Sequence, residues 1–188
     1  GIKGVHEVLQ VKLDRGASGL AIVADGYWPA KMGRDALQVS WNTDGVEKVD
    51  SDKQLAQYRE LAKQTGPRQF DADMAPLDKP PKHIDAEFVF PYLAHAPMEP
   101  LNCIVRLSED GCDIWAGDQF QTVDQANAAA AAGLEPRQVK IHTLFAGGSF
   151  GRRANPPSDY IVEGVHVAKA LGGRAPVHLV WTREDDLK

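Results

Sequence analysis

The chain has 188 residues, of which 43% are hydrophobic and 25% are charged, a balance typical of a globular protein with a sizeable core. Its formal net charge of −5 gives no support for a protein that binds nucleic acid or an anionic membrane surface, since such proteins carry a basic face. No apolar run reaches the roughly 18 residues that a membrane-spanning helix requires. No signal peptide precedes the first strand-like residues, and we expect both ends to be boundaries within a longer chain.

The first third of the chain predicts a small α+β unit. Apolar residues alternate at 5–13, which favours a strand, and the short apolar run at 20–25 favours a second one. Pro29 fits the first turn of a short helix that reaches Leu37. Residues 38–42 predict a third strand.

A second helix is predicted to begin at Ser51, where a capping-box pattern precedes an apolar helical stripe, and to end at Gly66. Residues 67–82 then carry four prolines and several charges, which is typical of a linker or an extended crossing segment. We therefore expect one domain over 1–66 and another over 83–188.

The rest of the chain predicts strands and helices that would form a mixed sheet with flanking helices. In chain order these are a strand at 84–90, a hairpin of 102–107 and 112–117, a helix from a capping box at Thr122 to Gly133, a strand at 138–145, a helix from Ser158 or Asp159 to Leu171, and a strand at 177–181. The acidic run 184–186 predicts a solvated strand end.

The two cysteines, Cys103 and Cys112, have no metal-binding spacing and no second pair, so a zinc or iron–sulfur site is not expected. The turn signal Asp110-Gly111 lies too close to Cys112 for the two sulfur atoms to face each other across the hairpin. We predict two buried thiols.

The stretch FAGGSFGRR, residues 145–153, lies between a predicted strand and a predicted helix. Its glycines allow backbone angles that other residues avoid, and successive N–H groups in such a turn can bind an anion. Arg152 and Arg153 would add forked donors suited to phosphate or carboxylate. The loop lacks both the G-x-G-x-x-G spacing and a Gly-Lys-Ser/Thr triplet. It is either an anion cradle with Phe150 at its centre or a plain turn with solvated arginines.

Other polar residues carry less information. His95 and Glu99 are four residues apart, but nearby prolines argue against a regular helix, so we expect a structural His–Glu pair and no metal site. Gln119 stands at a strand end, where it is by itself compatible with loop surface. Nucleophilic hydrolysis has no support, since neither G-x-S-x-G nor a convincing Ser/His/Asp set occurs.

Four strings in order resemble the molybdenum-binding subunit of the molybdenum hydroxylases, the xanthine dehydrogenase and aldehyde oxidase family. They are LAHAPMEPLNC, IWAGDQFQ, FAGGSFGRR and LVWTREDD. The double arginine and HAPMEPLNC look most like the branch of isoquinoline 1-oxidoreductase β-subunits, which is also described as the large subunit of a membrane-associated aldehyde dehydrogenase. The resemblance implies part of an α/β-hammerhead domain over 1–66, followed by the first part of a molybdopterin-binding domain.

The resemblance also implies a cofactor, molybdopterin, which is usually a cytosine dinucleotide in bacterial members. Eight residues match family positions at this cofactor: Gln119, Gly147, Gly148, Ser149, Phe150, Gly151, Arg152 and Arg153. No side chain would ligate the metal. The catalytic glutamate of the family lies near its C-terminus and has no match here, so we expect this piece to be inactive by itself, with or without bound cofactor. Ser149 departs from the glycine of many relatives.

The implied reaction is oxidative hydroxylation of an N-heterocycle or an aldehyde, with water as the oxygen source. Ala154 stands where xanthine-oxidising relatives have a glutamate, which disfavours a purine substrate. Implied partners are a small iron–sulfur (2Fe–2S) subunit, a cytochrome c as electron acceptor, the rest of the large subunit and, through surfaces that it would cover, a second copy of this piece. The longer protein could be periplasmic, membrane-associated or cytoplasmic. Two alternatives stay open: a non-enzymatic anion- or nucleotide-binding module, and a structural or interaction domain in which the loop is a turn.

Overall fold

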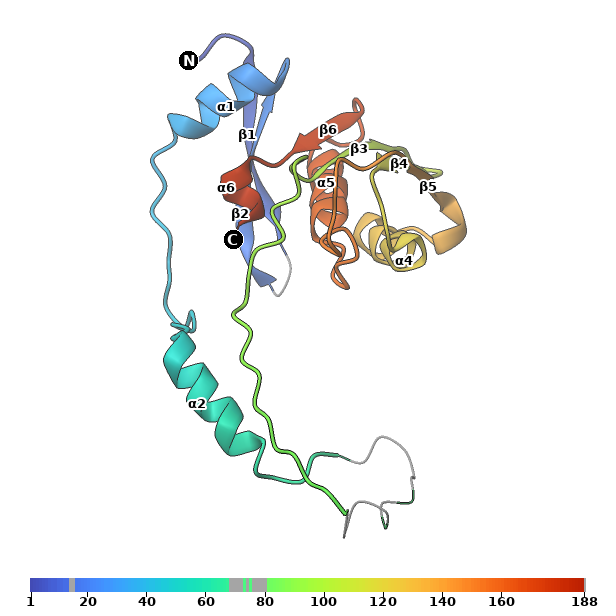
Figure 1. The fold of residues 1–188 in the computed structure, drawn as a ribbon. Helices are drawn as coiled ribbons and strands as arrows, with labels where there is room; N and C mark the ends of the chain where they lie inside the picture. The colour runs from blue at the N-terminus through green and yellow to red at the C-terminus, as the bar shows by residue number, and fades with distance from the viewer. Residues whose placement is uncertain (14–15, 68–72, 74, 76–80, 188) are drawn as a thin grey trace. The chain divides into compact units, whose positions relative to one another are not determined.

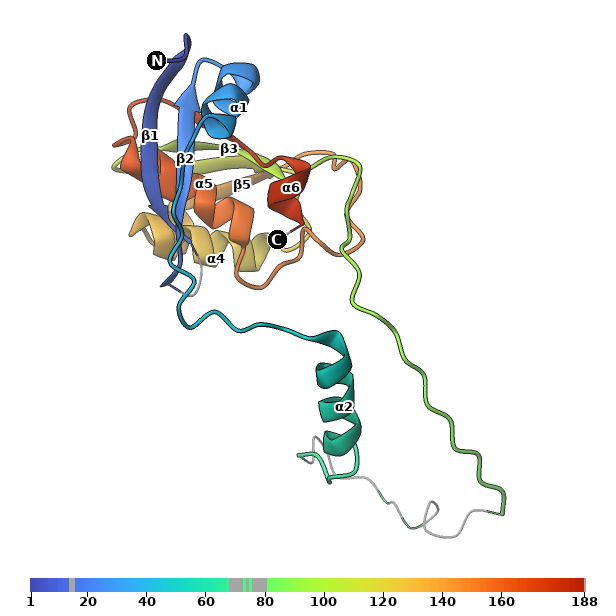
Figure 2. The ribbon, with the colours of Figure 1, turned by 90° about the vertical axis from the view of Figure 1, so that its left-hand side faces the viewer.

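A computed structural model of the chain describes residues 1–13, 16–67, 73, 75 and 81–187. The chain divides into two compact units, one formed by residues 1–37 together with 92–188 and the other by residues 38–91. Figure 1 labels the elements, and Figure 2 shows them from a second direction. Within the described residues, no helix combines the length and apolarity that a bilayer crossing requires.

The larger unit contains a mixed four-stranded sheet with helices on one face, as predicted. Its main elements are β3 (Asn102–Leu107), β4 (Cys112–Ala116), α4 (Gln121–Ala132), β5 (Val139–Thr143), α5 (Asp159–Ala170) and β6 (Val177–Val180). The strand order is β5-β4-β3-β6. Strand β3 runs antiparallel to β4 and β6, whereas β4 and β5 are parallel and joined through α4 and the short 3-10 turn Pro136–Gln138. The predicted hairpin is therefore confirmed.

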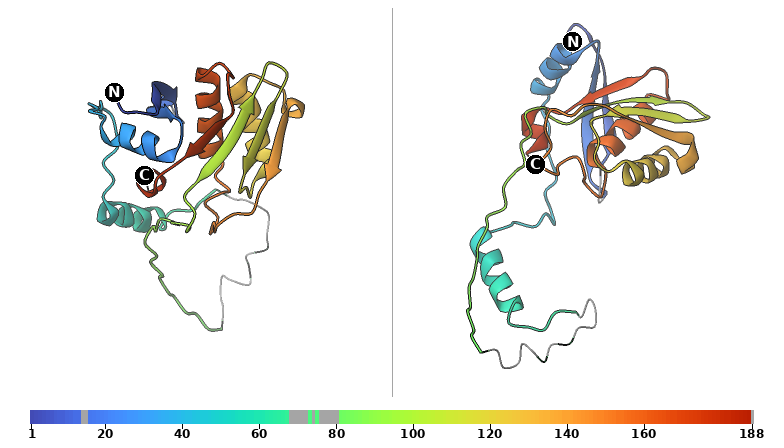
Figure 3. Two further views of the ribbon diagram at one scale, coloured as in Figure 1. Left: turned by 90° about the horizontal axis from the view of Figure 1, so that it is seen from above. Right: turned by 45° about the vertical axis from the view of Figure 1, so that its right-hand side comes forward.

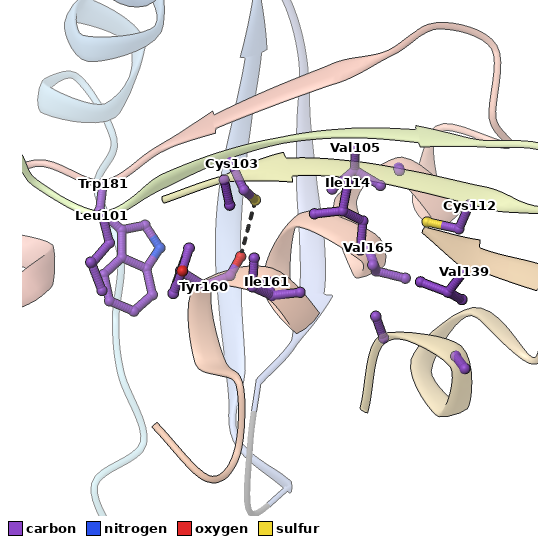
Figure 4. Close-up of a cluster of buried hydrophobic side chains, with 14 residues drawn as sticks. Leu101, Cys103, Val105, Cys112, Ile114, Val139, Tyr160, Ile161, Val165 and Trp181 are labelled. Atoms are coloured by element: carbon purple, nitrogen blue, oxygen red, sulfur yellow. Dashed lines mark hydrogen bonds between the residues drawn. The ribbon is translucent and has the colours of Figure 1, made fainter. Parts of the chain in front are cut away.

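The core lies between this sheet and helices α4 and α5. Side chains alternate along β3 and β4, so that Cys103 and Val105 on one strand and Ile114 on the next are buried. They meet Ile161 and Val165 from the stripe that α5 presents to the sheet. Figure 4 shows this cluster. Full burial of each aliphatic side chain stabilises the fold by about 1.5–3 kcal/mol.

Both cysteines are free and buried, as the sequence predicts. In the hairpin register Cys103 lies opposite Ala116, and Cys112 lies opposite Leu107, so the sulfur atoms do not face each other. Burial raises the pKa of Cys112 to about 11 and that of Cys103 further still. Cys103 Sγ donates to the carbonyl of Tyr160 at 3.4 Å, as drawn in Figure 4. The thiols are thus neutral packing groups.

The N-terminal hairpin packs on another face of α5. Its strands β1 (Val5–Lys12) and β2 (Ser18–Ala24) pair antiparallel, and α1 (Tyr27–Asp35) follows. Val11 of β1 contacts Val167 and Leu171 in a second apolar cluster, so α5 lies between the hairpin and the four-stranded sheet, as the left view of Figure 3 shows.

The smaller unit holds α2 (Ser51–Leu61), which confirms the predicted helix but corrects its cap. Asp50 is the N-cap, and its carboxylate accepts the N–H groups of Asp52 and Lys53 at 3.1 and 3.0 Å. Within this unit Arg59 pairs with Glu87 at 2.6 Å.

Two predicted strands of this unit are wrong. Residues 38–42 and 84–90 form no strand, and Ile84 and Phe90 are 90% and 83% exposed. A strand needs a neighbour for its N–H and C=O groups, and none pairs with these segments in the described part of the chain. Most of the predicted linker, 67–82, lies outside the described residues, so the division at that linker stays a prediction.

The close approach of α5 to β3 makes a specific prediction at Gly164. A Cβ there would lie 2.7 Å from Cys103 Sγ and 3.0 Å from Val105 Cγ2. Overpacking of a core costs about 1–3 kcal/mol, partly offset by the better helix propensity of alanine, so we expect Gly164→Ala to lower the free energy of unfolding by about 1–2 kcal/mol. Urea unfolding of the variant and the wild type measures this loss of stability.

The matched control is Gly66→Ala, because Gly66 is exposed, lies outside the helices and strands, and a Cβ there meets nothing within 4 Å. This control should unfold at the wild-type midpoint. Equal midpoints for Gly164→Ala and the control would contradict the packing of α5 on β3.

Candidate functional site

The predicted glycine loop and Gln119 lie at the same edge of the sheet. Parallel strands β4 and β5 pair up to Ala116 and Thr143, so the segments that leave their carboxyl ends begin side by side. The N–H of Leu144 donates to the carbonyl of Ala116 at 2.8 Å and extends the pairing by one residue. Beyond it, the hydroxyl of Ser149 donates to Oε1 of Gln119. Two strand ends thus bring the amide and the loop together.

The loop backbone enters the left-handed region at three positions. The φ angles of Gly148, Phe150 and Gly151 are 101°, 57° and 95°. Among the hydrogen bonds that the structure describes, none uses the N–H groups of residues 148–151. These positions are largely exposed. The loop therefore offers four consecutive main-chain donors to a ligand.

Arg153 anchors this loop from beneath. Its side chain is 0% exposed. Nε donates to the carbonyl of Gly148 at 3.0 Å, Nη1 to that of Gly117 at 3.2 Å, and Nη2 to the Glu99 carbonyl at 3.3 Å and carboxylate at 3.0 Å. Its own N–H donates to Ser149 Oγ at 3.1 Å. The sequence predicts an Arg153 guanidinium that faces an anion. In the structure the guanidinium is instead buried against the protein, where it fixes the path of the loop.

Glu99 supplies the negative charge that compensates the buried guanidinium of Arg153. Its Oε2 accepts from the N–H of Gly147 at 2.5 Å, its N–H donates to the carbonyl of that glycine at 3.1 Å, and Oε1 accepts from Asn102 Nδ2 at 2.8 Å. A Cβ at Gly147 would lie 2.5 Å from Glu99 Cβ, so this loop position must be glycine. The predicted His95–Glu99 pair is wrong, because the prolines prevent the helix that would align the two side chains.

The pKa of Glu99 is lowered. Partial burial acts against ionisation, but the hydrogen bonds from Asn102 and the Gly147 N–H, together with the charge of Arg153, outweigh it. A lowered pKa contributes stability that is present above the ordinary glutamate pKa of about 4.3 and is lost as the pH falls through the folded value. Acid therefore loosens the loop at its anchor.

Arg152 is also held internally, by two carboxylates. Nη2 donates to Asp159 at 2.8 Å and Nε to Asp186 at 3.1 Å, while the guanidinium carbon lies 5.4 Å from the centroid of the Trp181 ring. These contacts occupy the donors that were expected to reach a phosphate. Trp181 belongs to the segment before α6 (Arg183–Asp186), a short helix where a solvated strand end was predicted.

Asp186 is buried because it pairs with both Arg152 and Arg183, and Arg183 also donates to the carbonyl of Pro97. His95 lies beside this cluster, with Nε2 3.9 Å from the position of a Cβ at Gly151. A hollow of about 280 Å³ opens between them. The cluster balances two cations against two carboxylates, so it has no excess positive charge to attract an anion.

Apolar side chains are exposed next to the polar loop. Phe150 is 79% exposed, Phe145 is fully exposed, and Leu144 is half exposed. An exposed aromatic cluster beside free N–H donors is typical of a surface that a ligand or another part of a protein covers.

The start of α4 differs from the prediction at Thr122. The helix begins at Gln121 after Phe120, and the Asp118 carboxylate accepts the Phe120 N–H at 2.7 Å. Sequence reasoning missed Asp118 and the anchoring role of Glu99, although the string that contains Glu99 was singled out.

The buried anchor predicts a large loss of stability in Arg153→Met. Methionine fills similar space but removes the positive charge that Glu99 faces and the donors to the carbonyls of Gly148 and Glu99. Removal of one member of a buried ion pair costs about 3–5 kcal/mol, and we expect a loss of this size in urea unfolding. Arg153→Lys should not restore the stability, because an ammonium cannot reproduce the fork.

Arg137→Met is the matched control. Arg137 is 82% exposed and pairs only with nearby Glu135, so its unfolding midpoint should stay unchanged. Wild-type stability of Arg153→Met would contradict the anchor.

Comparisons with known proteins identify the family of this chain. A family model described as "Molybdopterin cofactor-binding domain" matches residues 60–188. The isoquinoline 1-oxidoreductase subunit beta of Brevundimonas diminuta is 30% identical over 201 residues, an alignment that covers 100% of this chain and 24% of that protein. The membrane-bound aldehyde dehydrogenase (pyrroloquinoline-quinone) of Gluconacetobacter polyoxogenes is 30% identical over 174 residues, 90% of this chain and 22% of that protein.

Among solved structures, quinoline 2-oxidoreductase from Pseudomonas putida 86 has a similar fold, with a TM-score of 0.63 and 14% identity over 99% of this chain and 28% of that chain. The chain thus spans about a quarter of the length of the proteins that it matches. The family resemblance of the four strings is confirmed. Because the family model matches 129 residues of this chain, from 60 to 188, the chain belongs to the molybdopterin cofactor-binding domain family.

Proposed function

We propose that this chain forms part of the cofactor-binding region of a molybdenum hydroxylase subunit, with Gln119 and residues 147–151 facing the molybdopterin. The observation that carries the proposal is the row of free N–H groups at residues 148–151, next to the Gln119 amide. Arg153 and Glu99 fix that row from the protein side, so its donors are already arranged before any ligand arrives.

The donor set fits the proposed group. Oxo groups and phosphates are hydrogen-bond acceptors, and the loop supplies neutral donors only. Because Gln119 Oε1 accepts from the Ser149 hydroxyl, the Nε2 group of that amide is left to donate toward the ligand. Ser149, which departs from the glycine of many relatives, thereby becomes an orienting residue. The open side of the loop needs no side chain to move away.

When bound, molybdopterin would supply the oxidative hydroxylation chemistry, with water as the oxygen source. The role of this chain would be to bind and orient the cofactor. Gln119 donates its amide, residues 148–151 donate N–H groups, and Phe150 covers the substrate side with an apolar surface. The arginines act indirectly: Arg153 holds the loop, and Arg152 ties it to α5 through Asp159.

The finer features of the longer protein are also proposals. Relatives named for isoquinoline and for aldehyde oxidation support an N-heterocycle or an aldehyde as the substrate. Ala154 provides no acid to contact a purine. We propose a catalytic glutamate elsewhere in the longer subunit, the cytosine dinucleotide form of the cofactor, a small 2Fe–2S subunit and a cytochrome c as the electron acceptor. Cytidine monophosphate released on acid hydrolysis of the purified protein would identify the dinucleotide form.

The loop predicts a specific loss of cofactor in Gly148→Ala. A side chain at φ 101° is strained by about 1–2 kcal/mol, which would shift the free N–H groups and weaken cofactor retention roughly tenfold. The measurement is molybdenum and pterin content of the longer subunit, copurified with its small subunit.

Gly45→Ala is the control, since Gly45 has a similar φ of 78° but lies in the smaller unit with nothing within 4 Å of a Cβ. It should retain the cofactor. An active wild-type protein without molybdenum and pterin would reject the proposal, and phosphate binding by such a protein would favour the anion-binding alternative.

We also expect the isolated chain to self-associate, because apolar side chains such as Phe145 are exposed. Light scattering should give a mass above that of the monomer that rises with concentration, and Phe145→Ser should lower it. A monodisperse monomer at high concentration would contradict this expectation.

A further inference from the structure

Two carboxyl groups that the proposed function leaves unused lie buried at the turn that carries Gln119. Asp118 is 7% exposed and Asp124 is 1% exposed. In each, Oδ2 is buried and has no hydrogen-bond partner in the part of the chain that the structure describes. The backbone of Phe120 links the two residues, since its N–H donates to Asp118 Oδ1 at 2.7 Å and its carbonyl accepts the N–H of Asp124 at 3.0 Å. Asp118 is close enough to Asp124 to raise the pKa of its carboxyl group. Two buried carboxylates would repel, whereas a carboxyl and a carboxylate can satisfy one another through one proton.

The other oxygens of this pair bind the surrounding elements. Asp118 Oδ1 accepts the N–H of Phe120 at 2.7 Å and closes a turn around the residue between them. Asp124 lies in the first turn of α4, and the nearby Ser158 hydroxyl lowers the pKa of its carboxyl group. Asn127 Nδ2 in turn donates to Ser158 Oγ at 2.8 Å, which directs the hydroxyl proton toward the carboxyl.

We propose that Asp118 and Asp124 share one proton and that this pair positions the side chain of Gln119. The pair joins the strand end that carries Gln119 to α4 and to Ser158, the residue before α5. The shared proton concerns the chain alone, whereas its positioning role rests on the proposed function of Gln119.

The charges that face the pair favour retention of the proton. From α5, Asp159 adds a negative charge, which Arg152 compensates at 2.8 Å, and the Tyr160 phenol lies close by. Burial raises the pKa of that phenol, so it stays neutral and contributes no charge of its own. Burial likewise raises the pKa of Asp124 to about 7, the Asp118 carboxylate adds to the rise, and the hydrogen bond from Ser158 opposes it.

The pair makes stability depend on pH in a defined direction. An aspartate in an unfolded chain has a pKa of about 4, so between about pH 4 and 7 the folded chain binds one proton more than the unfolded chain. This contribution is fully present at low pH and is lost as the pH rises to about 7. Through this window the pair makes the unfolding equilibrium constant rise by up to about tenfold per pH unit.

Asp124→Asn tests the shared proton, because its amide can donate to Asp118 without titrating. Unfolding constants are measured between pH 4.5 and 7.5 for the wild type, Asp124→Asn and Asp118→Asn. The ratio of the wild-type constant to either variant constant should rise by up to about tenfold per pH unit up to pH 7. Groups common to all three proteins, such as His166, cancel in this ratio.

Asp110→Asn is the control, since Asp110 is exposed, and its ratio to the wild type should stay flat. A flat ratio for Asp124→Asn and Asp118→Asn would overturn the shared proton. If a variant does not fold, infrared difference spectra of the wild type decide: a protonated carboxyl band at pH 5.5 that is lost by pH 8 supports the pair, and its absence overturns it.

The positioning role has its own readout. In ¹⁵N-resolved NMR spectra, the side-chain amide of Gln119 should shift with the titration of the pair in the wild type and stay constant in Asp124→Asn. The exposed amide of Gln64 is the internal control. A Gln119 signal whose chemical shift stays constant through the titration in the wild type would overturn the positioning role. Failure of the proposed function would appear separately, as missing molybdenum and pterin in the longer subunit.

Discussion

One buried guanidinium holds together the three segments that form the candidate site. Arg153 reaches the carbonyl before Asp118, the bend of the glycine loop, and Glu99 in the segment before β3. Desolvation of a charge is costly, and it is tolerated here because the guanidinium donates four hydrogen bonds, one to a carboxylate and three to carbonyls. This contact therefore joins the glycine loop to the strand end that carries Gln119 and to the segment before β3.

The anchor explains why certain positions are glycine. A Cβ at Gly117 would lie 2.9 Å from Ala146 Cβ and 3.1 Å from Arg153 Nη1, and a Cβ at Gly147 would lie 2.5 Å from Glu99 Cβ. These two glycines are required by close approach, whereas Gly148 and Gly151 are required by their left-handed backbone. The inner side of the loop is therefore fully used by the protein, and its outer side keeps the free N–H groups for a ligand.

Helix α5 connects the site to the rest of the larger unit. One of its faces completes the core under the four-stranded sheet, and another contacts the N-terminal hairpin. Its first turn carries Asp159, the partner of Arg152, and Ser158 just before it accepts a hydrogen bond from Asn127 of α4. The site thus has two polar attachments of different chemistry, the ion pair of Arg153 with Glu99 and the proposed proton-sharing pair of Asp118 and Asp124. Packing of α5 holds both in place.

The sequence by itself determined the elements that rest on local pattern: the β3–β4 hairpin, the helix that starts after Ser158, the separated thiols and the glycine loop. Periodicity, caps and turn residues act over a few neighbours, so they can be recognised in one string. Tertiary structure alone decided that Arg153 points inward to Glu99, 54 residues away, and that 84–90 forms no strand. The partner of a buried charge or of a strand edge comes from a distant segment, and no local pattern specifies which one will arrive.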